Sequence, residues 1–274
     1  MTVAELADSV ESELGYLEVN GVKLEVKHIA GRNPNAPTLI FLHEGLGCIE
    51  IWRDFPEKLA ALTGCPALVY NRQGYGRSAP CEVPRPLTYM HIEAIEVLPK
   101  LLAVAAIGDH ILVGHSDGGS ISLIHAGSCA TPGLKAVVTM APHVFCEELT
   151  VTSIAQTNSA YESGKLREGL AKYHHENVDC AFWGWNKAWL APASLQWNIE
   201  KYLPEINVPQ LLLQGEDDQY GSVAQVESIA AKSGASVEVR MLPDCGHSPY
   251  KEQESQSLSF VSEFITLIIS TTPH

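Results

Sequence analysis

The sequence predicts an α/β protein with a mostly parallel sheet of about eight strands flanked by helices. Two features predict it. Patterns typical of strands alternate with helical patterns, and this alternation stops in the middle of the chain and later resumes. Alternating strands and helices imply a parallel sheet covered on both faces. We therefore expect a core domain of residues 1–141 and 205–274, with residues 142–204 inserted as a helical cap.

The first part of the chain predicts a hairpin and then buried strands. Tyr16–Val19 and Val22–Ile29 flank Asn20-Gly21, a dipeptide that readily takes the positive φ angles of a tight turn. Continuous apolar stretches, as in strands buried on both faces, follow at Pro37–His43, Pro66–Tyr70 and Asp109–Gly114. We expect helices between them at Ile51–Leu62 and Thr88–Val104, the second kinked at Pro99.

The second part continues the pattern on either side of the insertion. A helix at Gly118–Cys129 and a strand at Leu134–Met140 precede it. The insertion itself has no convincing strand and has helical stretches such as Tyr161–Tyr173. After it we expect a strand, a helix, a strand and a closing helix, at Val208–Gln214, Val223–Lys232, Ser236–Leu242 and Glu252–Ile269.

Charge and composition exclude several classes of function. A formal net charge of −14 disfavours nucleic acid and anionic membranes as partners. The N-terminus lacks the features of a signal peptide, and no apolar run is long enough to cross a bilayer. The seven cysteines contain no CxxC pair, which favours reduced thiols over a disulfide framework or a metal site. We expect a cytoplasmic protein that acts on a small molecule, and the sequence leaves a homo-oligomer open.

A nucleophile motif follows the third buried strand. Gly114-His115-Ser116-Asp117-Gly118 is a G-x-S-x-G sequence between a strand and a helix, the setting in which a serine is exposed on a sharp turn. Glycine on both sides of the serine removes Cβ atoms that would crowd such a turn. This placement favours a nucleophilic Ser116 over a turn without chemistry.

A serine nucleophile needs a base and an acid that orients the base. Both are expected after later strands, because strand C-terminal ends meet at one edge of the sheet. His247 follows the last strand and is the predicted base. Asp218 is the predicted acid, with Asp217 as the main alternative. Glu216 is expected to be solvated, and an acid after the fourth strand, Glu147 or Glu148, is a less favoured alternative.

The loop after the first buried strand, His43-Glu44-Gly45-Leu46-Gly47, is the predicted oxyanion loop. Its glycines let a backbone N–H approach a developing negative charge. The N–H of Asp117, at the start of the following helix, is the second expected donor. We therefore predict an oxyanion hole made by Gly45 and Asp117.

Together these motifs resemble the α/β-hydrolase superfamily over almost the whole chain, in particular its capped serine esterases and C–C hydrolases. The loop Asn71-Arg72-Gln73-Gly74-Tyr75-Gly76-Arg77-Ser78 is similar to the D-x-R-G-x-G-x-S loop of that superfamily. The resemblance implies the α/β-hydrolase fold, the triad roles and a reaction without a cofactor. Because related dehalogenases and epoxide hydrolases have aspartate at the elbow, Ser116 implies acyl chemistry.

Two residues depart from the superfamily pattern. Glu44 replaces a glycine and either faces the substrate or pairs with an arginine such as Arg72, and we favour the structural role. Asn71 replaces an aspartate, which we interpret as structural.

The predicted cap contains four of the five tryptophans, at Trp183, Trp185, Trp189 and Trp197. We expect most of them to pack the cap onto the core and one or two, such as Trp185, to contact substrate. His143 is a further candidate for the pocket. His174-His175 is not expected to bind metal, because adjacent residues of a helix point to different faces.

These observations predict a serine hydrolase for a small to medium, largely apolar acyl compound, with a carboxylic ester favoured. The same triad also serves C–C bonds, lactones, amides and thioesters. The alternatives of another class are a ligand-binding or signalling protein on this scaffold, and a cofactor-free peroxidase or lyase.

Overall fold

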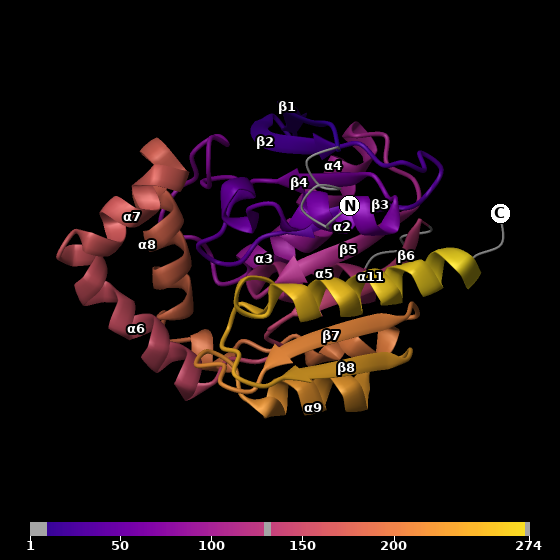
Figure 1. Ribbon diagram of the computed structural model, residues 1–274. Helices are drawn as coiled ribbons and strands as arrows, with labels where there is room; N and C mark the ends of the chain where they lie inside the picture. Colours follow the sequence, from indigo (N-terminus) through magenta and orange to yellow (C-terminus); the bar gives the residue numbers. More distant parts are fainter. Residues whose placement is uncertain (1–9, 129–132, 272–274) are drawn as a thin grey trace.

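The computed structural model describes residues 10–128 and 133–271. Its sheet has the strand order β1-β2-β4-β3-β5-β6-β7-β8. The strands are β1 (Ser12–Val19), β2 (Val22–Ile29), β3 (Thr38–Leu42), β4 (Ala67–Tyr70), β5 (His110–His115), β6 (Leu134–Met140), β7 (Gln210–Gly215) and β8 (Val237–Leu242). Only the β1–β2 and β2–β4 pairs are antiparallel, which confirms the predicted mostly parallel sheet of eight strands (Figure 1).

Helices cover both faces of this sheet, as predicted. The helices of the described residues are α2 (Phe55–Thr63), α3 (Tyr89–Ile92), α4 (Leu98–Val104), α5 (Asp117–Ser128), α6 (Glu148–Glu162), α7 (Lys165–His174), α8 (Val178–Trp189), α9 (Val223–Lys232), α10 (Pro249–Glu252) and α11 (Glu254–Thr271). Shorter 3₁₀-helical or π-helical segments are η1 (Ile49–Trp52), η2 (Glu93–Val97), η3 (His175–Asn177), η4 (Ser194–Gln196) and η5 (Glu200–Glu205). Cys129, the predicted end of one helix, and residues 1–9 of the acidic N-terminus lie outside the described residues.

The central strands are buried on both sides because two hydrophobic cores sandwich them. In β5, Ile111 and Val113 point into a core shared with α2 and α11, whereas Leu112 points into the core shared with α4, α5 and α9. Successive side chains of a strand face opposite sides, so a strand between two helix layers must be apolar throughout. This explains the continuous apolar stretches in the sequence.

Several predicted helices are irregular or interrupted in the structure. The Thr88–Val104 stretch contains α3, a π-helical turn (η2) and α4, so the irregularity precedes Pro99. Pro99 follows the π-helical turn directly within a continuous helical stretch, so the widened turn precedes the residue that cannot donate a helical hydrogen bond. The Tyr161–Tyr173 prediction was wrong in its continuity: Gly164, with φ of +93°, separates α6 from α7.

Residues 142–204 contain no strand of the sheet, only an isolated bridge between Phe145 and Asn198. Their helices α6, α7 and α8, which we call the helical layer, stand together at one side of the molecule, beside the sheet (Figure 1). Within the described parts of the chain, no helix is long and apolar enough to cross a membrane.

Candidate active site

Ser116 lies on the sharp turn between β5 and α5. Its φ of 51° is in the left-handed region, which non-glycine residues rarely adopt. A Cβ atom at Gly114 would overlap the backbone of Gly118, and one at Gly118 would overlap the carbonyl of Leu42. The glycines are therefore required by close backbone packing, and the turn that they allow presents Ser116 at the end of the sheet.

The structure brings the predicted triad residues into hydrogen-bond contact. Ser116 Oγ lies 2.9 Å from His247 Nε2, and His247 Nδ1 lies 2.9 Å and 2.8 Å from the two carboxylate oxygens of Asp218. In this arrangement His247 donates from Nδ1 to Asp218, so its Nε2 is free to accept the proton of Ser116. The contacts join residues that are 131 and 29 positions apart.

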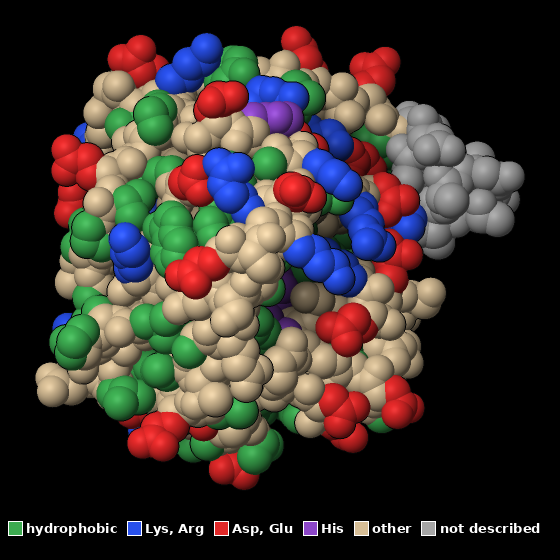
Figure 2. All heavy atoms as spheres, turned by 90° about the vertical axis from the view of Figure 1, so that its left-hand side faces the viewer, with side chains coloured by type: hydrophobic (Ala, Val, Ile, Leu, Met, Phe, Trp, Pro, Cys, Tyr) green, Lys and Arg blue, Asp and Glu red, His purple; other side chains and the backbone are tan. Residues whose placement is uncertain are grey.

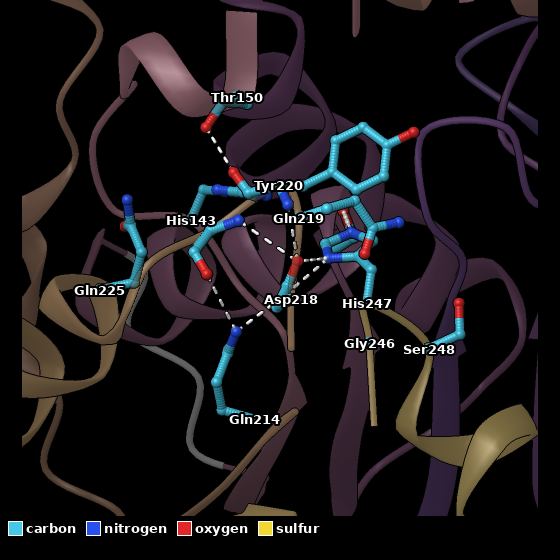
Figure 3. A network of polar contacts seen from close by, with 12 residues as sticks. His143, Thr150, Gln214, Asp218, Gln219, Tyr220, Gln225, Gly246, His247 and Ser248 are labelled. Atoms are coloured by element: carbon cyan, nitrogen blue, oxygen red, sulfur yellow. Dashed lines mark hydrogen bonds and ion pairs between the residues drawn. The ribbon is translucent and has the colours of Figure 1, made fainter. Parts of the chain in front are cut away.

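Asp218 is held by donors on several sides, and Figure 3 shows it between Gln214, the backbone of Tyr220 and His247. Tyr220 N donates to Asp218 Oδ1 at 2.8 Å, and Gln214 Nε2 donates to Oδ2 at 2.7 Å. Burial alone would raise the pKa of Asp218, but the hydrogen bonds from His247 and Tyr220 outweigh it and lower the pKa to about 2. Asp218 is thus ionised at neutral pH.

The alternative acids lie elsewhere. Glu216 and Asp217 are exposed, although they precede Asp218 directly in the chain. Glu147 binds Ser222 and Gln225 through its carboxylate, and Glu148 is exposed. Asp218 is the one of these five carboxylates that contacts His247.

Arg72, which is fully buried, determines how the predicted oxyanion loop is oriented. Its guanidinium donates to the carbonyl oxygens of His43, at 2.7 Å, and Glu44, at 3.0 Å. In a planar trans peptide the C=O and the next N–H point in opposite directions. Because Arg72 binds the Glu44 carbonyl from one side, the N–H of Gly45 faces the other side, away from the guanidinium.

His43 supports the same loop in its neutral form. Its Nδ1 donates to the Glu44 carbonyl at 2.7 Å, and its Nε2 accepts from the N–H of Arg72 at 3.2 Å. Burial and the neighbouring Arg72 charge hold the pKa of His43 well below its ordinary value. A neutral ring is the form that can donate from one nitrogen and accept at the other.

Asp117 is the first residue of α5, so its N–H has no partner within the helix. Its buried carboxylate accepts hydrogen bonds from Tyr89 and, at 3.2 Å, from Trp189 Nε1, and it lies 3.8 Å from the Arg72 guanidinium. The two hydrogen bonds and the nearby guanidinium charge offset the desolvation of the carboxylate. The bond from Trp189 also connects α8 directly to the turn that carries Ser116.

A cavity opens above Ser116, with about 470 Å³ of space including its mouth. It is lined by Glu44, Gly45, Leu46, Ser116, Asp117, His143, Thr150, Ile154, Trp185, Trp189, Tyr220 and His247. On the face that carries the helical layer, Figure 2 shows a hollow with histidine at its bottom. The cavity is therefore bounded by strand-end loops below and by α6 and α8 above.

Glu44 lines this cavity and does not form the ion pair with Arg72 that the sequence suggested, because Arg72 contacts only its carbonyl oxygen. The carboxylate instead lies 3.3 Å from Lys251 Nζ, 3.3 Å from the Tyr250 hydroxyl and 3.4 Å from His115 Nδ1. Burial alone would raise the pKa of Glu44, but Lys251 and His115 outweigh it and hold the pKa well below its ordinary value.

Two other predicted site residues also border the cavity. His143 is buried against Trp189 and His247, and burial together with the His247 charge lowers its pKa to about 4, so its ring is neutral at neutral pH. The ring of Trp185 packs so closely on Gly45 that a Cβ there would overlap it. Trp197 packs on Trp189, outside the cavity lining.

The remaining sequence predictions concern structural polar residues. Asn71 is fully buried, where it donates to Glu25 and accepts from the N–H of Ile49. His174 joins α7 to the core through the Leu46 carbonyl and the N–H of Gly76. Among residues 10–128 and 133–271, no group of three or more His, Cys, Asp or Glu side chains is arranged to hold a metal ion.

Sequence reasoning missed several residues of the site. Trp189 and Tyr220 line the cavity, and His115 donates from Nε2 to the His247 carbonyl at 2.7 Å. His115 and Tyr220 lie one and two residues from Ser116 and Asp218, so proximity to the triad was an available signal. Trp189 was one of the four cap tryptophans considered but was not singled out, because helical periodicity does not distinguish packing from contact with a ligand.

Comparison with known proteins agrees with this fold. A model of the "Alpha/beta hydrolase family" matches residues 39–256. A 2-succinyl-6-hydroxy-2,4-cyclohexadiene-1-carboxylate synthase of Salmonella paratyphi C is 32% identical over 120 residues, which span less than half of either protein, 44% of this chain and 44% of the relative.

Two solved structures illustrate the similarity in fold. The enol-lactonase of Burkholderia xenovorans LB400 superposes with a TM-score of 0.73 at 19% identity, over 92% of this chain and 100% of that chain. A 2-hydroxy-6-oxo-6-phenylhexa-2,4-dienoate hydrolase of Rhodococcus sp. strain RHA1 has a TM-score of 0.76 at 15% identity, over 93% of this chain and 99% of that chain.

Proposed function

Because the chain belongs to the alpha/beta hydrolase family, we propose that it is a serine hydrolase that forms an acyl-enzyme on Ser116. Its substrate is a small to medium, largely apolar acyl compound, with a carboxylic ester favoured. The observation that carries this proposal is the hydrogen-bonded series Ser116–His247–Asp218 at the bottom of an aromatic cavity.

The first half of the reaction forms the acyl-enzyme. His247 Nε2 takes the proton of Ser116 as the oxygen attacks the substrate carbonyl, and Asp218 stabilises the imidazolium. The N–H groups of Gly45 and Asp117 bind the resulting oxyanion. His247 then gives its proton to the leaving alcohol, and the C–O bond of the ester breaks.

The second half releases the acid. A water molecule gives its proton to His247 as it attacks the acyl carbonyl, and the same two N–H groups hold the second oxyanion. The proton returns to Ser116 as the acyl–oxygen bond breaks. Each proton in the cycle moves between Ser116, His247, water and the substrate.

Residues 142–204 act in this proposal as a cap that closes the cavity. Ile154 of α6 and the Trp185 and Trp189 rings of α8 form its apolar wall. A wall of this kind binds an acyl chain by excluding water. The cavity of about 470 Å³ favours a small to medium substrate over a polymer.

The test is hydrolysis of p-nitrophenyl esters of increasing acyl length by wild type and Ser116→Ala. We expect turnover by wild type, a fall of at least about 10³ in kcat for the variant, and a preferred acyl length that reports the depth of the cavity. Equal rates for the two proteins would reject Ser116 as the nucleophile.

The same substrate panel distinguishes the bond cleaved. Lactones, amides, thioesters and β-diketones are included, because one triad serves all of them. Hydrolysis of a β-diketone in preference to every ester would replace the esterase proposal with C–C hydrolysis at Ser116. Tight binding of a panel member without turnover would favour a ligand-binding role.

A further inference from the structure

Two cysteines far apart in the sequence meet where the helical layer contacts the core. Cys81 lies in the loop between β4 and α3, and Cys180 is the third residue of α8. Their Sγ atoms are 2.6 Å apart, and Cys180 Sγ lies 3.4 Å from Cys81 N and 3.3 Å from Cys81 O. Both residues are partly exposed, so a small oxidant can reach them.

The surroundings favour a thiolate on Cys180. The close contact with Cys81, together with the charge of Arg85, lowers the pKa of Cys180 to about 6. The same sulfur–sulfur contact, with burial, raises the pKa of Cys81. Cys180 also lies in the first turn of a helix, where the dipole stabilises a negative charge. The directions of the two pKa shifts thus favour the thiolate on Cys180 and the protonated thiol on Cys81.

The other described cysteines differ in all these respects. Cys48, Cys65, Cys146 and Cys245 are buried. Burial raises the pKa of each of these thiols. A protonated, inaccessible thiol reacts slowly with oxidants.

We propose that Cys81 and Cys180 are a site of reversible oxidation at which a peroxide forms a disulfide between the core and α8. This inference goes beyond the hydrolase function and does not depend on it. It is compatible with the expectation of reduced thiols, because both cysteines are free in the structure and the disulfide forms only on oxidation.

The reaction balances with one peroxide. The Cys180 thiolate attacks a peroxide oxygen, the O–O bond breaks, and a sulfenic acid and hydroxide form. The hydroxide takes the proton of the Cys81 thiol to give water. The Cys81 thiolate then attacks the Cys180 sulfur, the S–S bond forms and hydroxide leaves. The two thiols lose two electrons in total, and the peroxide accepts these two electrons.

The disulfide would limit the motion of α8 relative to the core. The segment that it closes contains β5, Ser116 and the whole of α6 and α7. Because α8 carries Trp185 and Trp189, oxidation fixes one wall of the cavity. Cross-linking a loop of this length raises Tm by roughly 5–15 °C in a domain of this size.

The test treats the full chain with hydrogen peroxide, followed by intact mass, non-reducing peptide mapping and thermal unfolding. We expect a loss of two hydrogen atoms, a linked Cys81–Cys180 peptide and the rise in Tm, all reversed by dithiothreitol. Cys146→Ser, the matched control, behaves as wild type. Cys81→Ser accumulates a sulfenic acid on Cys180 that dimedone traps, and Cys180→Ser forms neither product.

Mapping of the wild type alone decides the question, whether or not the variants fold. Free Cys81 and Cys180 after oxidation, or links spread equally over other cysteines, would overturn the proposal. Slower ester turnover on oxidation would additionally rest on the proposed hydrolase function, whereas the mass and Tm results do not.

Discussion

At the scale of single residues, Arg72 orients the predicted oxyanion loop although it does not line the cavity. It binds two successive carbonyl oxygens of the oxyanion loop and lies beside the Asp117 carboxylate. A planar guanidinium can make these contacts together, whereas an ammonium group presents one point charge. Arg72 is therefore a positioning residue, since it acts through the Glu44–Gly45 peptide.

We predict that Arg72→Lys lowers kcat for ester hydrolysis by on the order of 10², with little change in KM. The Gly45 N–H would no longer point at the oxyanion, and its hydrogen bond to the oxyanion stabilises the transition state more than the bound substrate. Arg85→Lys is the matched control, since Arg85 is also a buried arginine but donates to Gln73 rather than to the oxyanion loop. Steady-state kinetics of both variants provides the measurement. An equal loss of kcat in the two variants would mean that the effect of Arg72→Lys is general destabilisation and not misorientation of the loop.

Asp218 gives a second prediction at this scale, in the pH dependence of stability. Its pKa of about 2 is below the ordinary value of 3.8, so it contributes stability above about pH 4 that is lost as the pH falls toward 2. Between about pH 6 and about pH 3, the unfolding free energy of wild type should fall by about 1 kcal/mol more than that of Asp218→Asn.

Urea unfolding at the two pH values measures this difference. Asp217→Asn is the control, because the exposed Asp217 makes no bond to His247. The pH dependence of the unfolding free energy of this variant should equal that of wild type. Parallel pH dependence in wild type and Asp218→Asn would contradict the tight bonding of Asp218 in the folded state.

At the scale of elements, α8 is coupled to the nucleophile turn through Trp189. The indole N–H supplies one of the donors that offset the buried Asp117 charge at the start of α5. A neighbouring tryptophan differs in this respect: Trp197 is also buried, but its Nε1 has no hydrogen-bond partner in the structure as described. Comparing substitutions of Trp189 and Trp197 therefore distinguishes the contribution of the hydrogen bond from that of ring packing.

We predict that Trp189→Phe lowers the free energy of unfolding by about 1–3 kcal/mol more than Trp197→Phe, because only the first change removes a bond to a buried charge. Denaturant unfolding measures both values. We also expect Trp189→Phe to lower kcat, since the N–H of Asp117 is one of the two proposed oxyanion donors. Similar losses of stability in the two variants would mean that ring packing dominates.

At the scale of the whole molecule, the sequence predicted the parts that follow from periodicity and from turn chemistry. A strand between two helix layers must be apolar throughout, so β3 to β7 were recognisable. The sharp turn at Ser116 was recognisable because close backbone contacts leave no room for a Cβ atom at Gly114 or Gly118. His247 and Asp218 were predicted as base and acid because each directly follows one of the strands that come after Ser116 in the chain.

Other features depend on contacts that no local pattern encodes. Glu44 was expected near Arg72, yet its partners Lys251 and Tyr250 are more than two hundred positions away. The division between α6 and α7 was missed, because one glycine at a positive φ interrupts a stretch that is otherwise helical. The Cys81–Cys180 contact likewise joins distant segments that have no recognisable spacing.

The central claim is that Ser116 is an activated nucleophile, and labelling by a fluorophosphonate tests it most directly. The account predicts one phosphonyl group per chain, located on Ser116 by peptide mapping, with labelling slowed by His247→Gln and absent in Ser116→Ala. Labelling of Ser116→Ala at the wild-type rate, or a wild type that stays unlabelled while folded, would contradict it.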